Sequence, residues 1–349
     1  MRKRKLWLLV VLFLLILTAF FFARRHQKPV NESRFLFGTL IRITAYGPGA
    51  SVAVRQAFGE LERIHELTSQ TQGIVAQINA QAGKAPVSVG PEFFAFLRTV
   101  FKMAEASAGY FNPVIGALVE LWDFGYNGKG RIPSPEEVTA VLPLTRNNLV
   151  VLDDEGPTVY LKQAGMKLDL SGVAKGYAID RAWEILKRSG VVGALINGGE
   201  SSIRVLGERP GGGPWRIAIS HPRSKEWIGV VHLTSSQAVG TSADTQRYIE
   251  VEGKRYSHLL NPFTGYPPTD LSAVTIITDS AMKADLFSTA VFVAAAEDRA
   301  RLLARQQLEA LIIDRDMHVT MTPGFKTLLK REEEDEEGFG GKKTPGGGG

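Results

Sequence analysis

Asp285 and Thr289 place a carboxylate and a hydroxyl four residues apart on a segment with helical periodicity, so both project from one helix face. The residues around them are apolar on almost every side. A carboxylate in such surroundings is costly unless it is paired or bound to a cation. Carboxylate and hydroxyl oxygens suit Mg²⁺, which completes its shell with water and phosphate. Pairing of Asp285 with an arginine, or a loop-capping role, is the equally weighted alternative.

The stretch DLSGVAKGYAID, residues 169–180, joins a predicted strand to a predicted helix. Its glycines, Gly172 and Gly176, leave backbone N–H groups bare at a helix start, where a phosphate binds favourably. Lys175 adds a cation. Glycines at strand-to-helix turns are also common for structural reasons alone. Together with Asp285 and Thr289, the stretch predicts a site for a pyrophosphate-bearing molecule. Neither G-x-G-x-x-G nor G-x-x-x-x-G-K-[ST] occurs, so a Rossmann or P-loop site has no support.

Three more stretches combine polar residues with turn signals beside predicted strands or helices: residues 110–116, 197–202 and 256–268. Each also fits an ordinary turn, and the residues alone leave both interpretations open. His258, in the last stretch, is the only one of the six histidines flanked by such signals. A lone histidine is nonetheless more often a structural hydrogen-bonding group than a catalyst.

The elements that must position these residues mix strands with helices. Hairpins are predicted at 149–152 with 158–161 and at 310–313 with 319–321, and further strands at the end of 35–47 and at 194–196, 215–219, 228–233, 248–251 and 274–278. Helices are predicted over 54–67, 91–109 and 171–189, after a capping box at Ser134 and Glu137, and after a cap at Asp279 or Ser280. The pattern predicts an α+β fold with mixed or antiparallel sheets packed against helices.

Composition and charge limit the possible partners. The chain has 349 residues, 44% of them hydrophobic, which is enough for one large or two moderate domains. Its net charge of +5 comes from residues 1–33, with seven Lys and Arg against one Glu, and residues 34–329 are almost neutral. Without a basic stripe and interleaved aromatics, nucleic acid is not an expected partner. The absence of cysteine excludes disulfides, thiolate metal ligands and a cysteine nucleophile.

Residues 6–23 form an apolar run behind the basic residues 1–5, with Thr18 as the only polar member. As a helix the run would be roughly 27 Å long, enough to cross a hydrocarbon core. A cleaved signal peptide is the weaker alternative, because no small-x-small cleavage site ends the run. The charges predict a single-pass protein of the inner cell membrane with an extracytoplasmic body. Residues 24–33 are then a linker, 34–329 the folded domain, and 330–349 a disordered acidic and glycine-rich tail.

Seven motifs, in order, resemble those of the ApbE family over about residues 35–325: Gly38-Thr39, GYFNP (109–113), DLSGVAKGYAID, NGG (197–199), TSAD (241–244), HLLNPFTG (258–265) and Asp285-x-x-x-Thr289. Members of the family are FAD:protein FMN transferases. The resemblance implies Mg²⁺-dependent cleavage of the FAD pyrophosphate, transfer of FMN to a Ser or Thr hydroxyl of an acceptor flavoprotein, and release of AMP. It also implies an exported, membrane-tethered enzyme, often a lipoprotein. This chain has no cysteine to carry a lipid, and the predicted anchor would replace it.

The resemblance also implies roles for particular residues. Those that would bind Mg²⁺ are Asp285, Thr289 and, through its backbone carbonyl, Gly172. Those that would contact FAD are Phe37, Tyr110, Phe111, Asn112, Asp169, Lys175, His258, Leu259 and Leu260. Lys175 would stabilise charge on the phosphoryl oxygens and on the leaving AMP. The acceptor hydroxyl needs a base, and His258 and Asp244 are both candidates.

Four positions depart from the family pattern. Asn112 and Asn261 stand where many members have Asp, and Ser171 and Ala243 stand where Gly is usual. Loss of negative charge near the flavin or metal would weaken cation affinity or alter acceptor use. Two alternatives to transfer therefore stay open: an FAD pyrophosphatase with water as acceptor, and a membrane-tethered FAD-binding protein without transferase activity.

Overall fold

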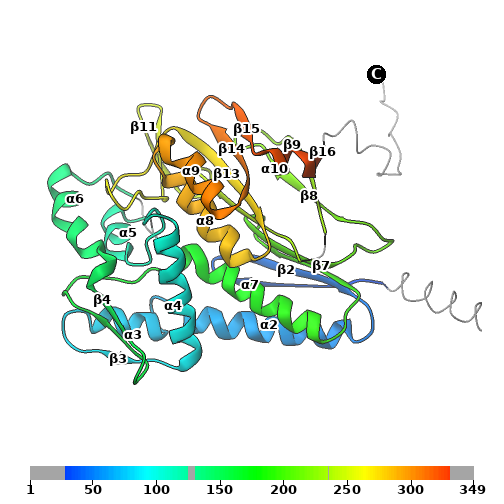
Figure 1. Cartoon of the computed structure of the whole chain (residues 1–349), viewed down its shortest axis with the longest axis horizontal. Coiled ribbons are helices and arrows are strands. Elements are labelled where there is room, and N and C mark those ends of the chain that lie inside the picture. The colour runs from blue at the N-terminus through cyan, green and yellow to red at the C-terminus, as the bar shows by residue number, and fades with distance from the viewer. Residues whose placement is uncertain (1–27, 125–129, 235, 331–349) are drawn as a thin grey trace, which may run out of the picture.

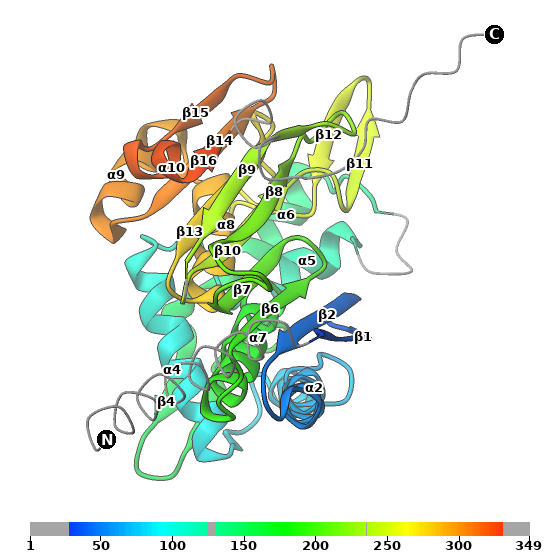
Figure 2. The same cartoon turned by 90° about the vertical axis from the view of Figure 1, so that its right-hand side faces the viewer.

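A computed structural model describes residues 28–124, 130–234 and 236–330 (Figures 1 and 2). The predicted anchor at 6–23, the basic residues before it and the tail from 331 onward lie outside the described residues. Within the described ranges, no helix is both long and apolar enough to cross a membrane.

The largest sheet of the described part has eight strands in the order β1-β2-β6-β7-β10-β13-β14-β15. Every neighbouring pair in it is antiparallel. Its strands are β1 (Val30–Leu36), β2 (Thr39–Tyr46), β6 (Gly193–Gly198), β7 (Ser202–Gly207), β10 (Ala238–Ala243), β13 (Leu271–Thr278), β14 (Glu309–Asp314) and β15 (Val319–Met321). The predicted α+β class with antiparallel sheets is confirmed.

Helices cover one face of this sheet. The helix α8 (Ala281–Val293) packs on β7, β10 and β13, and α7 (Ser171–Arg188) packs on α8, β6 and β7. The long helix α2 (Ala50–Leu67) lies beside α7 and against β1 and β2 (Figure 1). A core of buried aliphatic and aromatic side chains fills the space between α2, α7 and the sheet. The two helices that carry the predicted pyrophosphate and cation sites are therefore direct neighbours.

The opposite face packs on a smaller, three-stranded sheet. Its strands, in order, are β16 (Leu329–Lys330), β9 (Trp227–Leu233) and β8 (Trp215–Ser220), with α10 (Pro323–Leu328) beside them. Phe325 of α10 is fully buried in the core between the two sheets. Along β10 and β13, alternate residues therefore face either α8 or this second layer, so the sheet is buried on both sides there.

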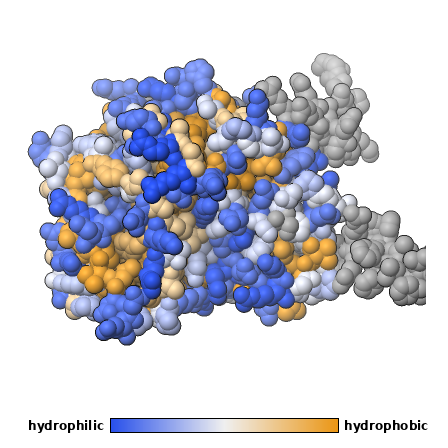
Figure 3. Space-filling model, in the orientation of Figure 1, coloured by the Kyte–Doolittle hydropathy of each residue, from blue (hydrophilic) through white to orange (hydrophobic). Residues whose placement is uncertain are grey.

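The remaining elements mostly pack on one another. They are α3 (Ile74–Ala80), α4 (Pro91–Ala106), α9 (Ala296–Gln306), the sheet β3 (Val87–Ser88)-β5 (Thr158–Leu161)-β4 (Val150–Asp153), α5 (Gly116–Trp122), α6 (Pro135–Val141), the 3₁₀ turns η1 (Leu142–Thr145) and η2 (Asn147–Leu149), and the hairpin β11 (Tyr248–Val251) with β12 (Lys254–Ser257). Hydrophobic residues reach the surface in separate areas among hydrophilic ones (Figure 3).

Most predicted elements are found, with local corrections. The capping box at Ser134 and Glu137 is present, and Ser280 caps α8 by accepting from the N–H of Lys283. The strand expected at the end of 35–47 is β2. It forms a hairpin with β1, which was not predicted, because the positive φ angles of Phe37 (51°) and Gly38 (74°) form a tight turn. Residues 30–33, expected to end a linker, belong to β1. The central strands β7 and β10 were not predicted at all.

Candidate active site

The helix α8 lies unusually close to its neighbours because two glycines face it. A Cβ on Gly176 of α7 would lie 2.5 Å from the carbonyl oxygen of Ala281, and one on Gly240 of β10 would lie 2.4 Å from the carbonyl carbon of Ala284. Real side chains do not tolerate such distances. These two glycines therefore fix how deeply α8 can sit between α7 and the sheet.

Asp285 is buried on α8, with 8% of its surface exposed. The hydroxyl of Ser202, at the start of β7, donates to its Oδ1 at 2.5 Å. Burial raises the pKa of Asp285 to about 6, against the opposing effects of the Lys175 charge, the Ser202 hydrogen bond and a hydrogen bond from the Gly176 backbone. The protein thus holds a carboxylate whose charge its own groups only partly stabilise.

Lys175 enters the same region from α7. Its Nζ donates to the carbonyl oxygen of Gly198 at 3.1 Å and to the hydroxyl of Ser201. Burial lowers the pKa of Lys175, and the negative charge of Asp285 opposes that shift. The predicted NGG turn is therefore what holds the lysine, in the neighbourhood of the carboxylate.

The NGG turn also meets the hairpin that carries the Gly38-Thr39 motif. Gly198 pairs with Ile41 across β2 and β6. Gly199 has φ of +68°, and a Cβ there would lie 2.0 Å from the hydroxyl oxygen of Thr39. Phe37, in the hairpin turn, packs edge-on to His65 with ring centroids 5.0 Å apart, and it also contacts buried core residues. The first and fourth predicted motifs are thus side by side.

The N-terminus of α7 brings two further motifs together. Asp169, which is buried, accepts from the backbone N–H of Ser171 at 2.8 Å, and its own N–H donates to the carbonyl of Pro113. The ring of Phe111 would be 3.1 Å from a Cβ on Gly172. The GYFNP turn therefore lies directly against the first turn of α7, where the sequence predicts phosphate binding.

Thr289 lies one helical turn after Asp285. Its hydroxyl is 3.1 Å from the hydroxyl of Ser242 on β10, which is also 2.9 Å from the hydroxyl of Ser288. The carboxylate of Asp285 and the hydroxyl of Thr289 are the hard oxygen atoms that α8 can offer to a cation. A buried carboxylate with a raised pKa beside neutral hydroxyls fits a hard divalent cation, which would stabilise its charged form.

His258 follows β12 and is half-buried. Its Nδ1 is 3.2 Å from the carbonyl oxygen of Arg247, which can only accept, so Nδ1 carries the proton and Nε2 keeps its lone pair. Burial lowers the pKa of His258 to about 4; the charge of Arg247 adds to this shift and that of Asp169 opposes it. The imidazole is therefore neutral at physiological pH, with Nε2 able to accept a proton.

Asp244, the other candidate base, has a different environment. Both oxygens of its carboxylate accept from the guanidinium of Arg223, at 2.8 and 2.5 Å, and Arg255 lies 4.0 Å away. A bidentate ion pair of this kind holds a carboxylate charged and occupied. The geometry therefore favours His258 over Asp244 as a base.

The remaining predicted contacts are mostly buried. The hydroxyl of Tyr110 donates to Asp298 at 2.7 Å, and its ring packs edge-on to Phe263. Leu259 belongs to the large core cluster around α4 and α8, whereas Leu260 packs in the cluster around Trp122. At both leucines the side chain is part of the hydrophobic core.

The two asparagines that depart from the family pattern have structural roles. The Nδ2 of Asn261 donates to the carbonyl of Val293 at 2.8 Å, while its Oδ1 accepts from the N–H of Phe263 at 2.8 Å. Asn112 is similar: Nδ2 donates to Thr145 O and Oδ1 accepts from Val114 N, both at 2.8 Å. Each amide both donates and accepts, which an ionised aspartate cannot do.

Sequence reasoning missed a network that holds the start of α8. Asp180, the last residue of the DLSGVAKGYAID stretch, accepts from the Ser280 hydroxyl at 2.6 Å and from the N–H of Ala281 at 2.8 Å. Arg204 of β7 donates to Asp180 at 2.5 Å and stacks over Trp183 at 3.9 Å. The quoted motif contained Asp180, but nothing in its spacing showed that it caps a helix a hundred residues later.

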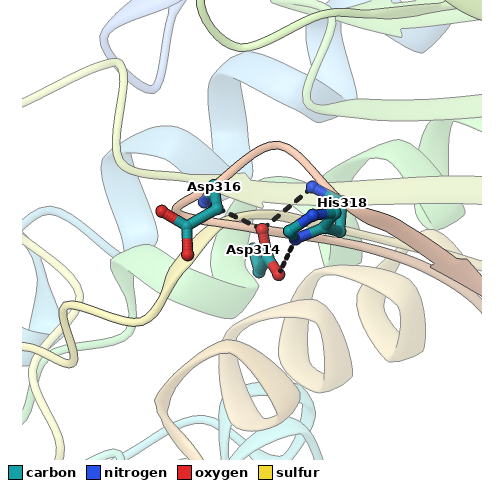
Figure 4. A group of neighbouring side chains, drawn as sticks. All are labelled: Asp314, Asp316 and His318. Atoms are coloured by element: carbon teal, nitrogen blue, oxygen red, sulfur yellow. Dashed lines mark hydrogen bonds and ion pairs between the residues drawn. The ribbon is translucent and has the colours of Figure 1, made fainter.

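A second group of potential metal ligands lies at the surface. Asp314, Asp316 and His318, in the turn between β14 and β15, are the one group of three acidic or histidine residues close enough to share a metal among the residues described (Figure 4). Asp314 already accepts from the N–H groups of Asp316 and His318 and contacts the His318 ring. These contacts form a capped surface turn.

The fold and the site together define an α+β protein in which α7, α8 and an antiparallel sheet bring a buried carboxylate, a lysine and several hydroxyl groups together, with a neutral histidine after β12. The ApbE family model matches residues 37–312, and the chain belongs to the ApbE family. It is 32% identical over 301 residues to a Klebsiella pneumoniae FAD:protein FMN transferase, covering 85% of this chain and 92% of that one. The Treponema pallidum enzyme of the same name is 31% identical over 323 residues, covering 86% and 89%.

Solved structures agree with this assignment. The ApbE protein of Thermotoga maritima superimposes with a TM-score of 0.81 at 32% identity, over 87% of this chain and all of that one (100%). The apo flavinyl transferase ApbE of Pseudomonas stutzeri gives a TM-score of 0.77 at 29% identity, over 87% and 97%. The predicted family is confirmed.

Proposed function

We propose that this chain is a Mg²⁺-dependent FAD:protein FMN transferase, which cleaves the FAD pyrophosphate, passes FMN to a Ser or Thr hydroxyl of an acceptor flavoprotein and releases AMP. The names of its relatives support the reaction. The observation that carries the proposal is that Lys175 and Asp285, from separate helices, meet beside the NGG turn at the α7–α8 contact.

The chain's own groups supply the binding functions. The positive end of the α7 dipole, at Gly172, would attract the pyrophosphate. The N–H groups of Ser171, Val173 and Ala174 already donate to Asp169 and Leu170. Lys175 adds positive charge to the phosphoryl oxygens as the bond to AMP lengthens. Because Gly198 and Ser201 hold its ammonium group, Lys175 is already positioned before substrate binds.

Asp285, Thr289 and the carbonyl of Gly172 would hold Mg²⁺. When bound, the ion would neutralise charge on the pyrophosphate and polarise the phosphorus that is attacked. Asp285 would bind the ion as a charged carboxylate. A bound cation favours the charged form of this side chain, which burial alone disfavours.

His258 is proposed as the base. Its Nε2 lone pair would take the proton of the acceptor hydroxyl as oxygen attacks the FMN phosphorus, and the leaving AMP would depart with the pyrophosphate bond electrons. The carbonyl of Arg247 orients the ring by accepting from Nδ1. A group with a pKa near 4 is a weak base in the free protein, and a nearby phosphate would raise its basicity.

The proposal includes a membrane location. Residues 6–23 would anchor the chain in the inner membrane, with the catalytic domain on the extracytoplasmic side. Deleting residues 1–23 should move the protein from the membrane fraction to the soluble fraction of lysed cells. Recovery of the shortened chain with the membranes would contradict this part of the proposal.

One reaction tests the function. The detergent-solubilised full chain is incubated with FAD, Mg²⁺ and a flavoprotein acceptor of a related ApbE enzyme. A flavin-fluorescent acceptor band that survives a denaturing gel, lost with EDTA and with the acceptor Ser or Thr replaced by Ala, is the expected result. AMP and free FMN without a labelled band would indicate a pyrophosphatase, and intact bound FAD would indicate a binding protein.

A further inference from the structure

Two neighbouring strands present a matched set of small residues to α8. Gly240 of β10 pairs directly with Ser202 of β7, so their side-chain positions share one face of the sheet. Ser242 lies two residues along β10 and therefore faces the same way. Gly240 allows the close approach of α8, and the serines on either side reach its functional residues.

Each serine contacts one of the proposed cation ligands. Ser202 donates to the carboxylate of Asp285, and Ser242 lies 3.1 Å from the hydroxyl of Thr289. Ser202 and Ser242 are both buried, at 1% and 8% exposure. Neither contact could be found from spacing, because β7 and β10 lie far from α8 in sequence.

The protons of the hydroxyl chain can be assigned from its far end. The hydroxyl of Ser288 lies 3.0 Å from the backbone carbonyl of Asp285. A carbonyl can only accept, so Ser288 donates its single hydroxyl proton to it. In the 2.9 Å contact between Ser242 and Ser288, Ser242 must then donate. In the 3.1 Å contact between Ser242 and Thr289, Thr289 must donate.

The consequence concerns the oxygen of Thr289. A neutral hydroxyl that binds a cation offers a lone pair and must direct its own proton away from the ion. The chain from Thr289 through Ser242 and Ser288 to the Asp285 carbonyl directs that proton toward the sheet, which leaves the lone pairs of Thr289 free. We propose that Ser242 and Ser288 are positioning residues that orient the Thr289 hydroxyl as a ligand for a divalent cation.

This inference rests on the proposed cation site, so its test separates the two. Mn²⁺ alone is titrated into the full chain in detergent, without FAD or acceptor, and free Mn²⁺ is followed by electron paramagnetic resonance. Asp285→Ala tests the cation site itself and should abolish binding. Binding that survives in Asp285→Ala would place the ion elsewhere and overturn both proposals.

Ser242→Ala tests the positioning role. Loss of a partner that orients a metal ligand typically costs about 10-fold to 100-fold in affinity, and the dissociation constant for Mn²⁺ should rise by about 10-fold or more. Ser288→Ala should have a smaller effect, because Thr289 can still donate to Ser242. Wild-type affinity in Ser242→Ala, alongside lost binding in Asp285→Ala, would overturn the positioning role and leave the cation site standing.

A matched control and a double variant exclude a merely structural effect. Thr241 and Thr275 form a 3.0 Å hydroxyl pair between β10 and β13, on the opposite face from Ser242. Thr275→Val removes that hydroxyl and should leave Mn²⁺ affinity unchanged.

In a Thr289→Val background there is no hydroxyl to orient, so adding Ser242→Ala should cost nothing further. Independent, additive losses would contradict the proposal. If Ser242→Ala does not fold, Ser242→Cys, whose somewhat larger thiol accepts hydrogen bonds poorly, replaces it.

Discussion

Two regions of the molecule present carboxylates as possible metal ligands, and they differ in how the protein treats the charge. At the β14–β15 turn, hydrogen bonds from His318 and the backbone lower the pKa of Asp314 despite the opposing effect of burial. At the α7–α8 contact, burial raises the pKa of Asp285 to about 6. At the surface turn, hydrogen-bond donors of the turn stabilise the charge of Asp314. At the buried site, the charge of Asp285 is only partly stabilised by the protein, and a bound cation would stabilise it further.

The comparison shows that residue type and proximity are poor guides to a site. Asp314, Asp316 and His318 have the right atoms close together, and they are exposed or half-buried with Asp314 already used as an acceptor (Figure 4). Asp285 accepts from the Ser202 hydroxyl, is 8% exposed, and interacts with the charge of Lys175 and, less strongly, with that of Asp180. Incomplete stabilisation of a buried charge is the better signal.

The largest effect expected is that of Asp285→Ala on catalysis. Removing the buried carboxylate should lower Mg²⁺-dependent transfer by about 1000-fold, as expected when charge stabilisation in the transition state is lost. Asp314→Ala, at the surface turn, should keep the wild-type rate. Flavin fluorescence of the labelled acceptor measures both, and circular dichroism checks their folding. A folded, fully active Asp285→Ala protein would remove the distinction between the two regions.

His258→Gln should give the next largest effect. Loss of a positioned general base typically costs about 100-fold or more in kcat. KM for FAD should change less, because the proposed phosphate-binding groups, Lys175 among them, are on α7. Asp244→Asn serves as the comparison, since the ion pair with Arg223 already occupies Asp244. A larger kcat loss in Asp244→Asn than in His258→Gln would assign the base to Asp244 instead.

The close packing of α8 predicts that alanine is destabilising at Gly240 and not at Gly59. Gly240→Ala should destabilise the protein by about 1–3 kcal/mol, because the new Cβ would overlap the backbone of Ala284. Gly59, in α2, has nothing within 4 Å of a built Cβ, so Gly59→Ala should stabilise by about 0.5–1 kcal/mol. Urea denaturation of the two variants measures both. Equal stabilities would mean that α8 does not need the close approach.

Asn261→Asp tests whether the departures from the family pattern are structural. An aspartate cannot donate to the carbonyl of Val293 at the end of α8, and the lost donor should cost about 1–3 kcal/mol. Mn²⁺ affinity should not rise, because the side chain is committed to the turn. A stable Asn261→Asp protein with tighter cation binding would show that the missing charge matters to the site.

The sequence was sufficient for the parts of the fold that follow local rules. Helices such as α4 and α7, and hairpins such as β4–β5, show their apolar period and turn residues directly. It was also sufficient to single out Asp285, Thr289 and Lys175, because a charge or hydroxyl in an apolar helix is conspicuous. The family motifs then grouped them.

The strands β7 and β10 escaped prediction for a physical reason tied to the site. Their faces toward α8 carry Ser202, Arg204, Gly240 and Ser242 in place of large apolar residues, so only the opposite faces, with Ile203 and Val205 on β7 and Val239 on β10, carry large apolar side chains. Those small and polar residues are what allow α8 to approach and its side chains to be hydrogen-bonded. A strand buried on both faces normally appears as a nearly continuous apolar run, and these residues interrupt that run. Asp180 was missed because its partners on α8 are remote in sequence.

The smallest effect expected is a pH dependence of stability that differs between His258 and the surface turn. The pKa of His258 is about 4 in the folded protein and 6.5 ordinarily, so between these values the unfolded chain binds a proton that the folded one does not. Stability from this residue is fully present above pH 6.5 and is lost as the pH falls toward 4, and His258→Gln should flatten that slope. His318→Gln acts on Asp314, whose pKa lies below its ordinary 3.8, so its effect should be confined to more acidic pH, below about 4. Urea midpoints across the acidic range measure both slopes. An unchanged slope in His258→Gln would mean that the imidazole is not held neutral in the folded protein.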